Sequence, residues 1–357
     1  MNQKKELVLF VPGMGANEPE QNLKKLVDGI RDYCDGKGIS FNSLDNNEDE
    51  NAGVRNIQLG LGDKSKTIEI REVFWSDLRP RLSTECSLRK FLRGFDLLFY
   101  WAGSFKTWVS ASRSKYILIN MVLTLILFLV WYYGAVAAVF TAIGASPEVL
   151  GFTLTEGWEK WFRDAGDTMG SWNVWVSAAV LMTIFPVADV IDISFGTKCF
   201  LQNRLGLQHK INGRLSRALG SVTRDSAKYS NVTVVAHSFG VVIATETLAA
   251  FDKQKLPVQR LITLGGPLEL IQGRSDRVRE ARERLENLLN TDNFVNWVDF
   301  YSDYDWLCSK TPVSDGIEGF EHRKITTTVP WDQRASGASH LLYFTDWDVM
   351  KELVKLE

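Results

Sequence analysis

The feature of this sequence that most restricts its fold is a pair of long stretches without charge. Residues 116–147 and residues 168–188 contain no Lys, Arg, Asp or Glu, although these types make up 24 % of the chain. The remaining residues have the charge content of an ordinary water-soluble domain. The chain therefore combines a soluble body with an apolar insert, which excludes both a wholly globular protein and a multi-span transporter.

The insert, residues 111–191, is predicted to form a hairpin of two membrane-spanning helices. A helix needs about 20 apolar residues to cross about 30 Å of hydrocarbon, and the first span, at about 117–143, exceeds this length. The second span, at about 172–191, is barely long enough and holds Pro186 and Asp189 near its end. A buried or re-entrant helix is the alternative for that second segment.

The residues around the insert predict its orientation. Trp158, Trp161 and Phe162 adjoin charged residues in the loop of the hairpin, which is typical of a membrane–water interface. Five Lys or Arg residues lie within 20 residues of the outer ends of the hairpin, against two in its loop, and such a bias favours a cytosolic body. We expect no secretory signal peptide, because the first residues reach a strand pattern by Leu7 without a preceding apolar region. We expect an integral protein of an inner or plasma membrane whose body faces the cytoplasm.

The segment before the first span has the pattern of an amphipathic helix with basic residues nearby. Such a helix either lies on the bilayer or packs on the sheet. The apolar positions that recur at three- and four-residue steps are Phe91, Phe95, Leu98, Phe99, Ala102, Phe105 and Val109.

Charge and cysteine content exclude several classes of protein. The net charge of −2 gives no support to a nucleic-acid partner. The four cysteines, Cys34, Cys86, Cys199 and Cys308, are scattered and form no CxxC pair. They indicate neither a disulfide framework nor a metal site, and we expect free buried thiols.

The body, residues 1–110 and 192–357, alternates short apolar strands with helices. Strands are expected at 7–11, 67–75, 232–237, 260–265, 294–301 and 324–329, and helices at about 19–34, 199–228, 241–253, 274–290 and 346–356. Continuous apolar strands separated by helices indicate a sheet covered on both faces. The fold class is therefore α/β, with a mainly parallel sheet of about six strands and a polar surface loop at 43–53.

The segment VTVVAHSFGVVIATETLAAF contains a candidate nucleophile, Ser238, in a strand–turn–helix context. A serine on such a strained turn projects its hydroxyl from the sheet. Residues two before and two after it crowd together and must be small, as Ala236 and Gly240 are. The following helix N-terminus supplies the Phe239 N–H and a dipole that favours a developing oxyanion.

A glycine-rich turn follows the first expected strand in VLFVPGMGAN. The backbone N–H of Met14 is the expected second oxyanion donor beside that of Phe239, and Gly13 and Gly15 are expected to permit close approach to the serine. A phosphate-binding Walker loop is excluded because no GK[ST] follows.

A serine nucleophile needs a base, and the chain has four histidines. His340 follows the last expected strand in SGASHLLYF, a loop rich in small residues, and is the predicted base. The alternatives fit less well, because His237 adjoins the serine, His209 lies in a basic helix, and His322 leads into a strand.

The base in turn needs a carboxylate that fixes its tautomer. Asp305 lies beyond the end of the strand FVNWVDFY, where a loop can turn it toward His340, and is the predicted acid. Asp303 is a close rival, whereas Asp299 is expected inside the strand. The order Ser, Asp, His along the chain matches the order found in hydrolases whose serine lies on such a strand–turn–helix elbow.

Together these segments resemble the α/β-hydrolase superfamily of the lipase and esterase type. The resemblance covers residues 1–80 and 230–357 and rests on VLFVPGMG, VVAHSFG, TLGGPLEL, WVDFYSDYDWL and ASHLLYF. It implies that the family acid is Asp305 and that the base precedes an aromatic residue, here Tyr343.

The sequence departs from the pattern of that superfamily at three places. Ala236 replaces the first Gly of the elbow, and Pro12 stands where such families often carry His, so only backbone donors are expected in the oxyanion hole. The membrane insert is additional to the minimal fold.

The resemblance implies a membrane-anchored serine hydrolase that cleaves carboxylic esters without a metal or other cofactor. A lipase or phospholipase acting on membrane lipid is the leading expectation, because a tether concentrates the enzyme at lipid. A tethered general esterase or thioesterase is an alternative, as is a non-catalytic module that binds, senses or oligomerises through the hairpin. A regulated membrane-damaging effector is a third possibility.

Overall fold

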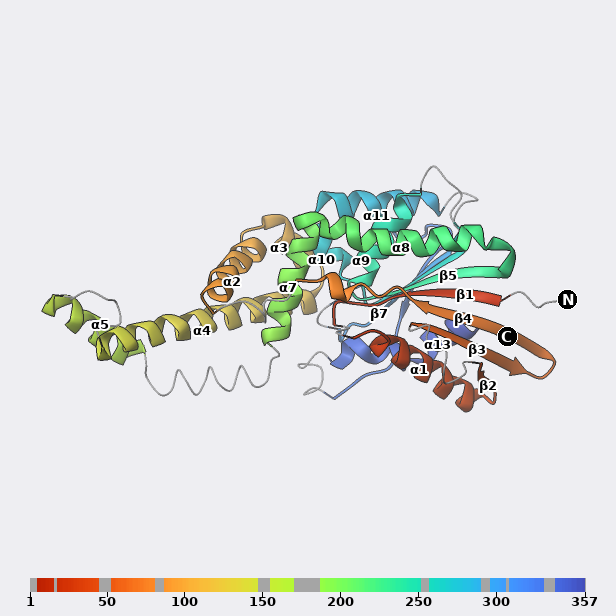
Figure 1. Ribbon diagram of the computed structural model, residues 1–357, viewed down its shortest axis with the longest axis horizontal. Helices are drawn as coiled ribbons and strands as arrows, with labels where there is room; N and C mark the ends of the chain where they lie inside the picture. The colour runs from red at the N-terminus through yellow and green to blue at the C-terminus, as the bar shows by residue number, and fades with distance from the viewer. Residues whose placement is uncertain are drawn as a thin grey trace.

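The computed structural model describes residues 5–15, 18–44, 53–80, 87–146, 155–169, 187–251, 257–289, 296–305, 308–330 and 338–356. The body of the chain is an α/β unit in which helices cover both faces of one mixed sheet. A long helix projects from one end of this body (Figure 1). The broad α/β prediction is therefore confirmed.

The sheet has eight strands in the order β2-β3-β4-β1-β5-β6-β7-β8. Neighbouring strands from β4 through β8 in this order pair in parallel, whereas β3 pairs antiparallel with both β2 and β4. The strand bounds are β1 (Lys5–Val11), β2 (Ser40–Ser43), β3 (Val54–Leu61), β4 (Lys64–Glu72), β5 (Tyr229–His237), β6 (Arg260–Leu264), β7 (Asn296–Tyr301) and β8 (Phe320–Lys324).

The central strands are buried on both faces, which explains their continuous apolar sequences. In β5, Val234 and Ala236 face one core and Val235 faces the other. Five helices make up most of the cover, with α8, α9 and α11 on one face and α1 and α13 on the other (Figure 1). They are α1 (Gln21–Lys37), α8 (Leu207–Arg224), α9 (Gly240–Ala249), α11 (Asp276–Leu288) and α13 (Trp347–Val354).

The expected number of about six strands is wrong. The β2–β3 pair is an antiparallel extension at the sheet edge, and most of the expected loop at 43–53 lies outside the described residues. The last strand is also misplaced, because β8 occupies 320–324 instead of 324–329. Ile325 still donates its N–H to Tyr301, the last residue of β7, but beyond that point β7 offers no further partner.

The expected helix at 199–228 is broken into two. Helix α7 (Val187–Leu201) ends before a short 3₁₀ turn, and α8 begins at Leu207. The backbones of Asn203, Leu205 and Gly206 are all left-handed, with φ of 47°, 52° and 71°. An α-helix of L-residues does not pass through such positions, so the chain changes direction there.

Two helices, α2 (Ser87–Ala102) and α3 (Phe105–Ser112), lead from the body into the insert, whose first long helix is α4 (Lys115–Ala145). Among the described residues one helix, Ile117–Ala145, is long and apolar enough to cross a membrane. The predicted hairpin is thus not found in the described part of the chain. Of its second span, residues 172–186 lie outside that part, and the rest begins α7.

The expected loop of the hairpin contains a helix, α5 (Glu156–Met169), which packs against the far end of α4 (Figure 1). Glycines allow the two backbones to approach closely. A Cβ at Gly144 would lie 2.9 Å from the Cα of Arg163, and a Cβ at Gly166 would lie 3.0 Å from the Cα of Thr141. The charged helix α5 therefore packs against the last turns of α4.

The expected amphipathic segment before α4 divides into α2 and α3, because α2 ends before Gly103 and Ser104 caps α3. One side of α2 packs on the body, where Leu97 is fully buried. Phe99 and Phe105 are instead 71 % and 82 % exposed. The segment thus packs on the protein and also presents large apolar side chains to its surroundings.

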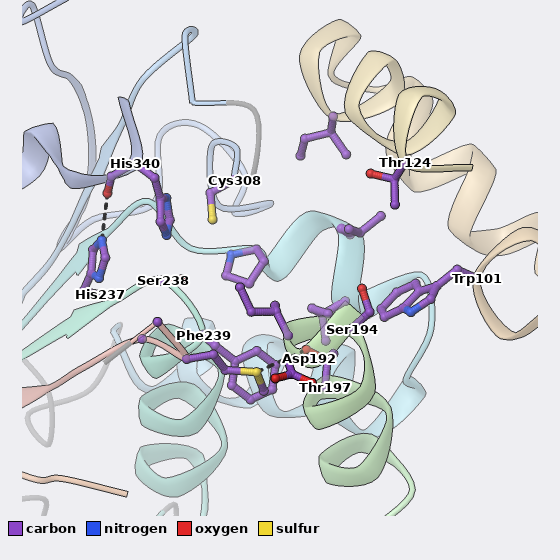
Figure 2. A pocket seen from close by; sticks show the side chains of 18 of the residues that line it. Trp101, Thr124, Asp192, Ser194, Thr197, His237, Ser238, Phe239, Cys308 and His340 are labelled. Atoms are coloured by element: carbon purple, nitrogen blue, oxygen red, sulfur yellow. Dashed lines mark hydrogen bonds between the residues drawn. The ribbon is translucent and has the colours of Figure 1, made fainter. Parts of the chain in front are cut away.

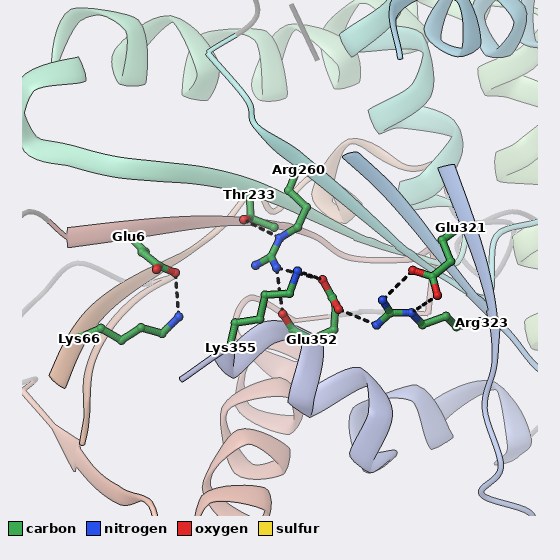
Figure 3. Close-up of polar contacts among 8 residues, drawn as sticks. All are labelled: Glu6, Lys66, Thr233, Arg260, Glu321, Arg323, Glu352 and Lys355. Atoms are coloured by element: carbon green, nitrogen blue, oxygen red, sulfur yellow. Dashed lines mark hydrogen bonds and ion pairs between the residues drawn. The ribbon is translucent and has the colours of Figure 1, made fainter. Parts of the chain in front are cut away.

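A network of charged side chains fixes α13 to the edge of the sheet (Figure 3). The buried Glu352 carboxylate accepts hydrogen bonds from Arg260 at 3.0 Å and from Arg323 at 2.6 Å, and pairs with Lys355 at 2.6 Å. Arg323 also pairs with the exposed Glu321. Because Arg260 is itself buried, its charge depends on Glu352 for compensation.

We therefore expect Glu352→Ala to lower the free energy of unfolding by about 3–5 kcal/mol, since it leaves buried Arg260 without its carboxylate partner. Glu321→Ala removes only an exposed partner and should cost at most about 1 kcal/mol. Urea unfolding of the full chain in detergent measures both losses. Equal losses in the two variants would contradict this role of Glu352.

Candidate active site

Ser238 occupies a sharp turn between β5 and α9. Its φ of 56° is left-handed, which is uncommon for a residue other than glycine. Such strain costs about 1–3 kcal/mol and persists only where surrounding contacts impose it. Here the Ser238 N–H donates to the Leu264 carbonyl of β6 at 2.9 Å. The expected strand–turn–helix elbow is therefore confirmed as local geometry.

Small residues pack the elbow against the end of β1. A Cβ at Gly13 would lie 2.5 Å from the Cβ of Ser238, and a Cβ at Gly240 would lie 2.3 Å from the Val11 carbonyl oxygen. Ala236 is completely buried beneath the turn. The expectation for Gly15 is wrong, because a Cβ there would meet no atom within 4 Å.

The two expected oxyanion donors are backbone N–H groups of buried residues. Met14 and Phe239 are only 2 % and 3 % exposed. Within the described part of the chain, neither N–H donates to a protein acceptor. Buried N–H groups without partners are rare in proteins. Two of them beside one strained serine are suited to receive a negatively charged oxygen.

Side chains that follow β4 hold the glycine-rich turn in place. The Trp75 indole N–H donates to the Pro12 carbonyl at 2.8 Å, and Arg79 donates to the Met14 carbonyl at 2.6 Å. From α7, Thr197 directs its hydroxyl to the Met14 sulfur at 3.5 Å. The turn is thus fixed by contacts from two segments that are distant in the sequence.

The predicted base and acid form a buried pair. His340 Nδ1 lies 2.8 Å from Asp305 Oδ2, and the Tyr343 hydroxyl donates to the same oxygen at 3.0 Å. Space for this arrangement comes from Gly265, where a Cβ would lie 2.5 Å from the Tyr343 ring and 2.9 Å from Asp305 Oδ2. Since a carboxylate accepts hydrogen bonds, it orients the ring with Nδ1 protonated and Nε2 available as a base.

The two rival carboxylates have other partners. Asp303 forms an exposed ion pair with Lys324. Asp299 is fully buried and accepts hydrogen bonds from Thr263, Thr311 and His322. The geometry therefore selects Asp305 over both alternatives.

The other three histidines do not take the position of the base. His322 pairs with Asp299, and His209 is exposed on α8. The buried His237 donates from Nε2 to the His340 carbonyl at 2.9 Å, and the two rings lie 4.7 Å apart. Burial, together with the nearby His340, holds the pKa of His237 well below its usual range. His237 therefore supports the loop of His340 as a neutral ring.

Ser238 and His340 line one cavity of about 480 Å³ (Figure 2). Part of its wall is formed by the glycine-rich turn and by polar residues of α1, namely Gln21, Asn22 and Lys25. Helix α7 contributes mostly polar side chains, among them Asp192, Ser194 and Thr197. Apolar side chains from three other helices form much of the rest, and they include Leu97, Leu98, Trp101, Ile117, Met121, Leu125, Phe128, Leu270 and Ile271. The cavity thus connects the strained serine to the apolar helix α4.

Cys308 also lines this cavity, close to the acid–base pair (Figure 2). Burial and the carboxylates of Asp305 and Asp299 raise the pKa of its thiol well above the usual range. A thiol that stays protonated is a poor nucleophile. Cys34 and Cys199 are likewise free and buried, as expected, and Cys86 lies outside the described residues.

The arrangement offers a nucleophile on a strained turn, an imidazole oriented by a carboxylate, and two backbone donors that find no acceptor among the described residues. These are the groups that acyl transfer requires. Comparison of the chain with protein-family models, curated proteins and solved structures finds no match.

Four residues with supporting roles were not predicted from the sequence: Trp75, Arg79 and His237 hold the loops of the site, and Tyr343 bonds to the acid. Tyr343 was noted only as an aromatic near the base. The remaining three contacts join segments far apart in the chain, and no local pattern marks them.

The close approach of Gly13 to Ser238 gives a specific prediction. In Gly13→Ala the added methyl group displaces the serine or the turn, and a misplacement of about 1 Å costs about 100-fold in rate. Gly15→Ala is the matched control, because its methyl group enters open space. The rate of labelling of Ser238 by a fluorophosphonate measures the effect. Similar rates for the two variants would show that this contact does not position the serine.

Proposed function

We propose that this protein is a membrane-anchored serine hydrolase of the α/β-hydrolase type that cleaves carboxylic esters of lipids. The single observation that carries the proposal is the joint placement of Ser238 and the Asp305–His340 pair. A left-handed serine and a histidine paired with a buried carboxylate lie at one cavity, which Ser238 and His340 line, beside two backbone N–H groups that donate to no acceptor among the described residues.

In the proposed reaction, the Ser238 hydroxyl oxygen attacks the acyl carbon while its proton passes to Nε2 of His340. The N–H groups of Met14 and Phe239 stabilise the resulting oxyanion. The carbon–oxygen bond of the ester then breaks, and the leaving alcohol takes the proton from His340. Water, deprotonated by His340, then attacks the acyl carbon, the bond from that carbon to the Ser238 oxygen breaks, and His340 returns the proton to Ser238 as the acid leaves. Asp305 keeps Nδ1 protonated throughout, and no cofactor is needed.

The walls of the cavity support a lipid as the substrate. Its apolar part is formed by α2, α4 and α10 (Leu268–Gln272) and is suited to an acyl chain. Helix α4 has two apolar faces. Ile117, Met121 and Phe128 are buried toward the cavity. The opposite face exposes Ile119, Val122, Ile126, Leu129 and Tyr133, each by 37–57 %.

The exposed face of α4 supports the proposed membrane anchor. Its residues recur at three- and four-residue steps, which forms one continuous apolar stripe. At the far end, the exposed Trp158 and Trp161 of α5 lie beside charged residues, as at a membrane–water interface. The excess of Lys and Arg on the side of the body favours a cytosolic catalytic domain.

The nucleophile is tested by labelling with a fluorophosphonate, which forms a covalent bond with an activated serine. We expect wild-type protein to be labelled and Ser238→Ala to be unlabelled. Ser194→Ala is the control, because Ser194 lines the same cavity (Figure 2) and should leave labelling intact. Equal labelling of wild type and Ser238→Ala would refute the assignment.

The acyl-chain wall is tested by a pair of neighbouring residues on α4. Leu125 lines the cavity, whereas Ile126 belongs to the exposed stripe. In Leu125→Trp the larger ring fills the cavity, so we expect kcat/KM for a long-chain ester to fall at least about tenfold. Hydrolysis of a short soluble ester should fall much less. Ile126→Trp should change neither rate.

Hydrolysis of lipid in liposomes by the wild-type protein separates a lipase from a general esterase. Release of fatty acid from liposomes by the wild-type protein supports the lipid substrate. If the protein cleaves short soluble esters but never bilayer lipid, the lipase proposal fails and a tethered esterase or thioesterase remains. If Leu125→Trp and Ile126→Trp behave alike, the cavity beside α4 does not hold the acyl chain.

A further inference from the structure

The thiol of Cys308 is a buried polar group that the proposed reaction does not use. It lies near both members of the acid–base pair. A ligand atom from each of Asp305, Cys308 and His340 lies within 4.8 Å of the other two, and all three residues are buried. Carboxylate oxygen, thiolate sulfur and imidazole nitrogen are the three donor types that Zn²⁺ takes in proteins.

We propose that Asp305, Cys308 and His340 form an inhibitory site for Zn²⁺ or a cation of similar softness. The cation takes the place of the proton between His340 Nδ1 and Asp305. Three protein donors leave one coordination position of a tetrahedral ion for water, as in other three-ligand zinc sites. The mixture of sulfur, nitrogen and oxygen donors disfavours Mg²⁺ and Ca²⁺, which prefer oxygen alone.

The surroundings of the three residues support a cation. Asp299, two strand residues before the end of β7, adds a second carboxylate near Cys308. The Tyr343 hydroxyl holds Asp305 Oδ2 in place, as partners of metal-binding carboxylates do. Cys308 also borders two hollows, the catalytic cavity and a groove that contains Asp305 and Ser309. A cation can therefore reach the site by either route.

Binding of the cation accounts for inhibition through the protons that it displaces. Coordination forms Zn–N, Zn–S and Zn–O bonds, and it releases the Nδ1 proton of His340 and the thiol proton of Cys308. His340 then no longer donates to Asp305, which withdraws the carboxylate from its role in stabilising an imidazolium. A positive ion on Nδ1 also lowers the basicity of Nε2. The base can no longer take the Ser238 proton, so the proposed hydrolysis stops.

The binding step does not depend on the proposed function, whereas the inhibition step rests on it. Binding is therefore measured first in full-length Ser238→Ala, which is inactive under the proposal. Co²⁺ serves as the probe, because a Co²⁺–thiolate bond gives a charge-transfer absorption band. We expect the band in Ser238→Ala and in Cys34→Ala, whose buried thiol on α1 is not one of the three donors. We expect no band in Cys308→Ala.

Inhibition is measured as the Zn²⁺ concentration that halves each variant's own metal-free rate. We expect this concentration to rise at least about tenfold in Cys308→Ala relative to Cys34→Ala, since even outer partners of metal ligands contribute about 10- to 100-fold to affinity. A chelator should restore the wild-type rate. Circular dichroism verifies that both variants are folded.

Three results would overturn the proposal. The first is a thiolate band that never forms, and the second is a band that persists in Cys308→Ala. The third is a band with the expected dependence on Cys308 but no slowing of hydrolysis by Zn²⁺, which refutes inhibition. If the metal-free protein hydrolyses no ester, the proposed function fails on its own, and the Co²⁺ band still decides the metal site.

Discussion

The left-handed backbone of Ser238 is the constraint on which the rest of the site depends. A serine adopts φ of 56° only because its neighbours leave no alternative. Gly13 and Gly240 have no side chain to resist the close contact between β1 and the elbow, and the Leu264 carbonyl receives the Ser238 N–H. The parallel sheet therefore positions the serine directly, because β5 ends beside it while β1 and β6 each contribute one of these contacts.

The sequence predicts elements well where periodicity and burial coincide. The central strands are continuous apolar runs because both of their faces are covered, and five of the six expected strands match. β2 was not predicted because SFNS is a short polar strand at the sheet edge, and β3 was not predicted because polar residues and glycine interrupt the apolar positions of VRNIQLGL. β8, with the sequence FEHRK, lies beside β7 through pairing, although the following KITTTV has the stronger strand propensity.

The local sequence pattern was sufficient to predict Ser238, whereas tertiary contacts were needed to identify the residues that lie with it in the site. The strand–turn–helix pattern marks the serine, but choosing Asp305 over Asp303 requires the 2.8 Å bond to His340. The supporting bonds from Trp75, Arg79 and His237 span long stretches of chain. The cluster around Cys308 likewise was not predicted, since Asp305 and Cys308 share one loop but His340 lies far along the chain, and the three give no CxxC-type spacing.

The apolar insert that dominates the sequence contributes to the site as well as to the surface. One face of α4 lines the cavity of Ser238 while the other is exposed, so the proposed anchor and the proposed substrate wall belong to one helix. The central claim, that Ser238 and His340 act as one unit, is tested most directly by kcat/KM for Ser238→Ala, His340→Ala and the double variant. The account predicts that the double variant loses no more activity than either single variant. Losses that multiply would contradict it.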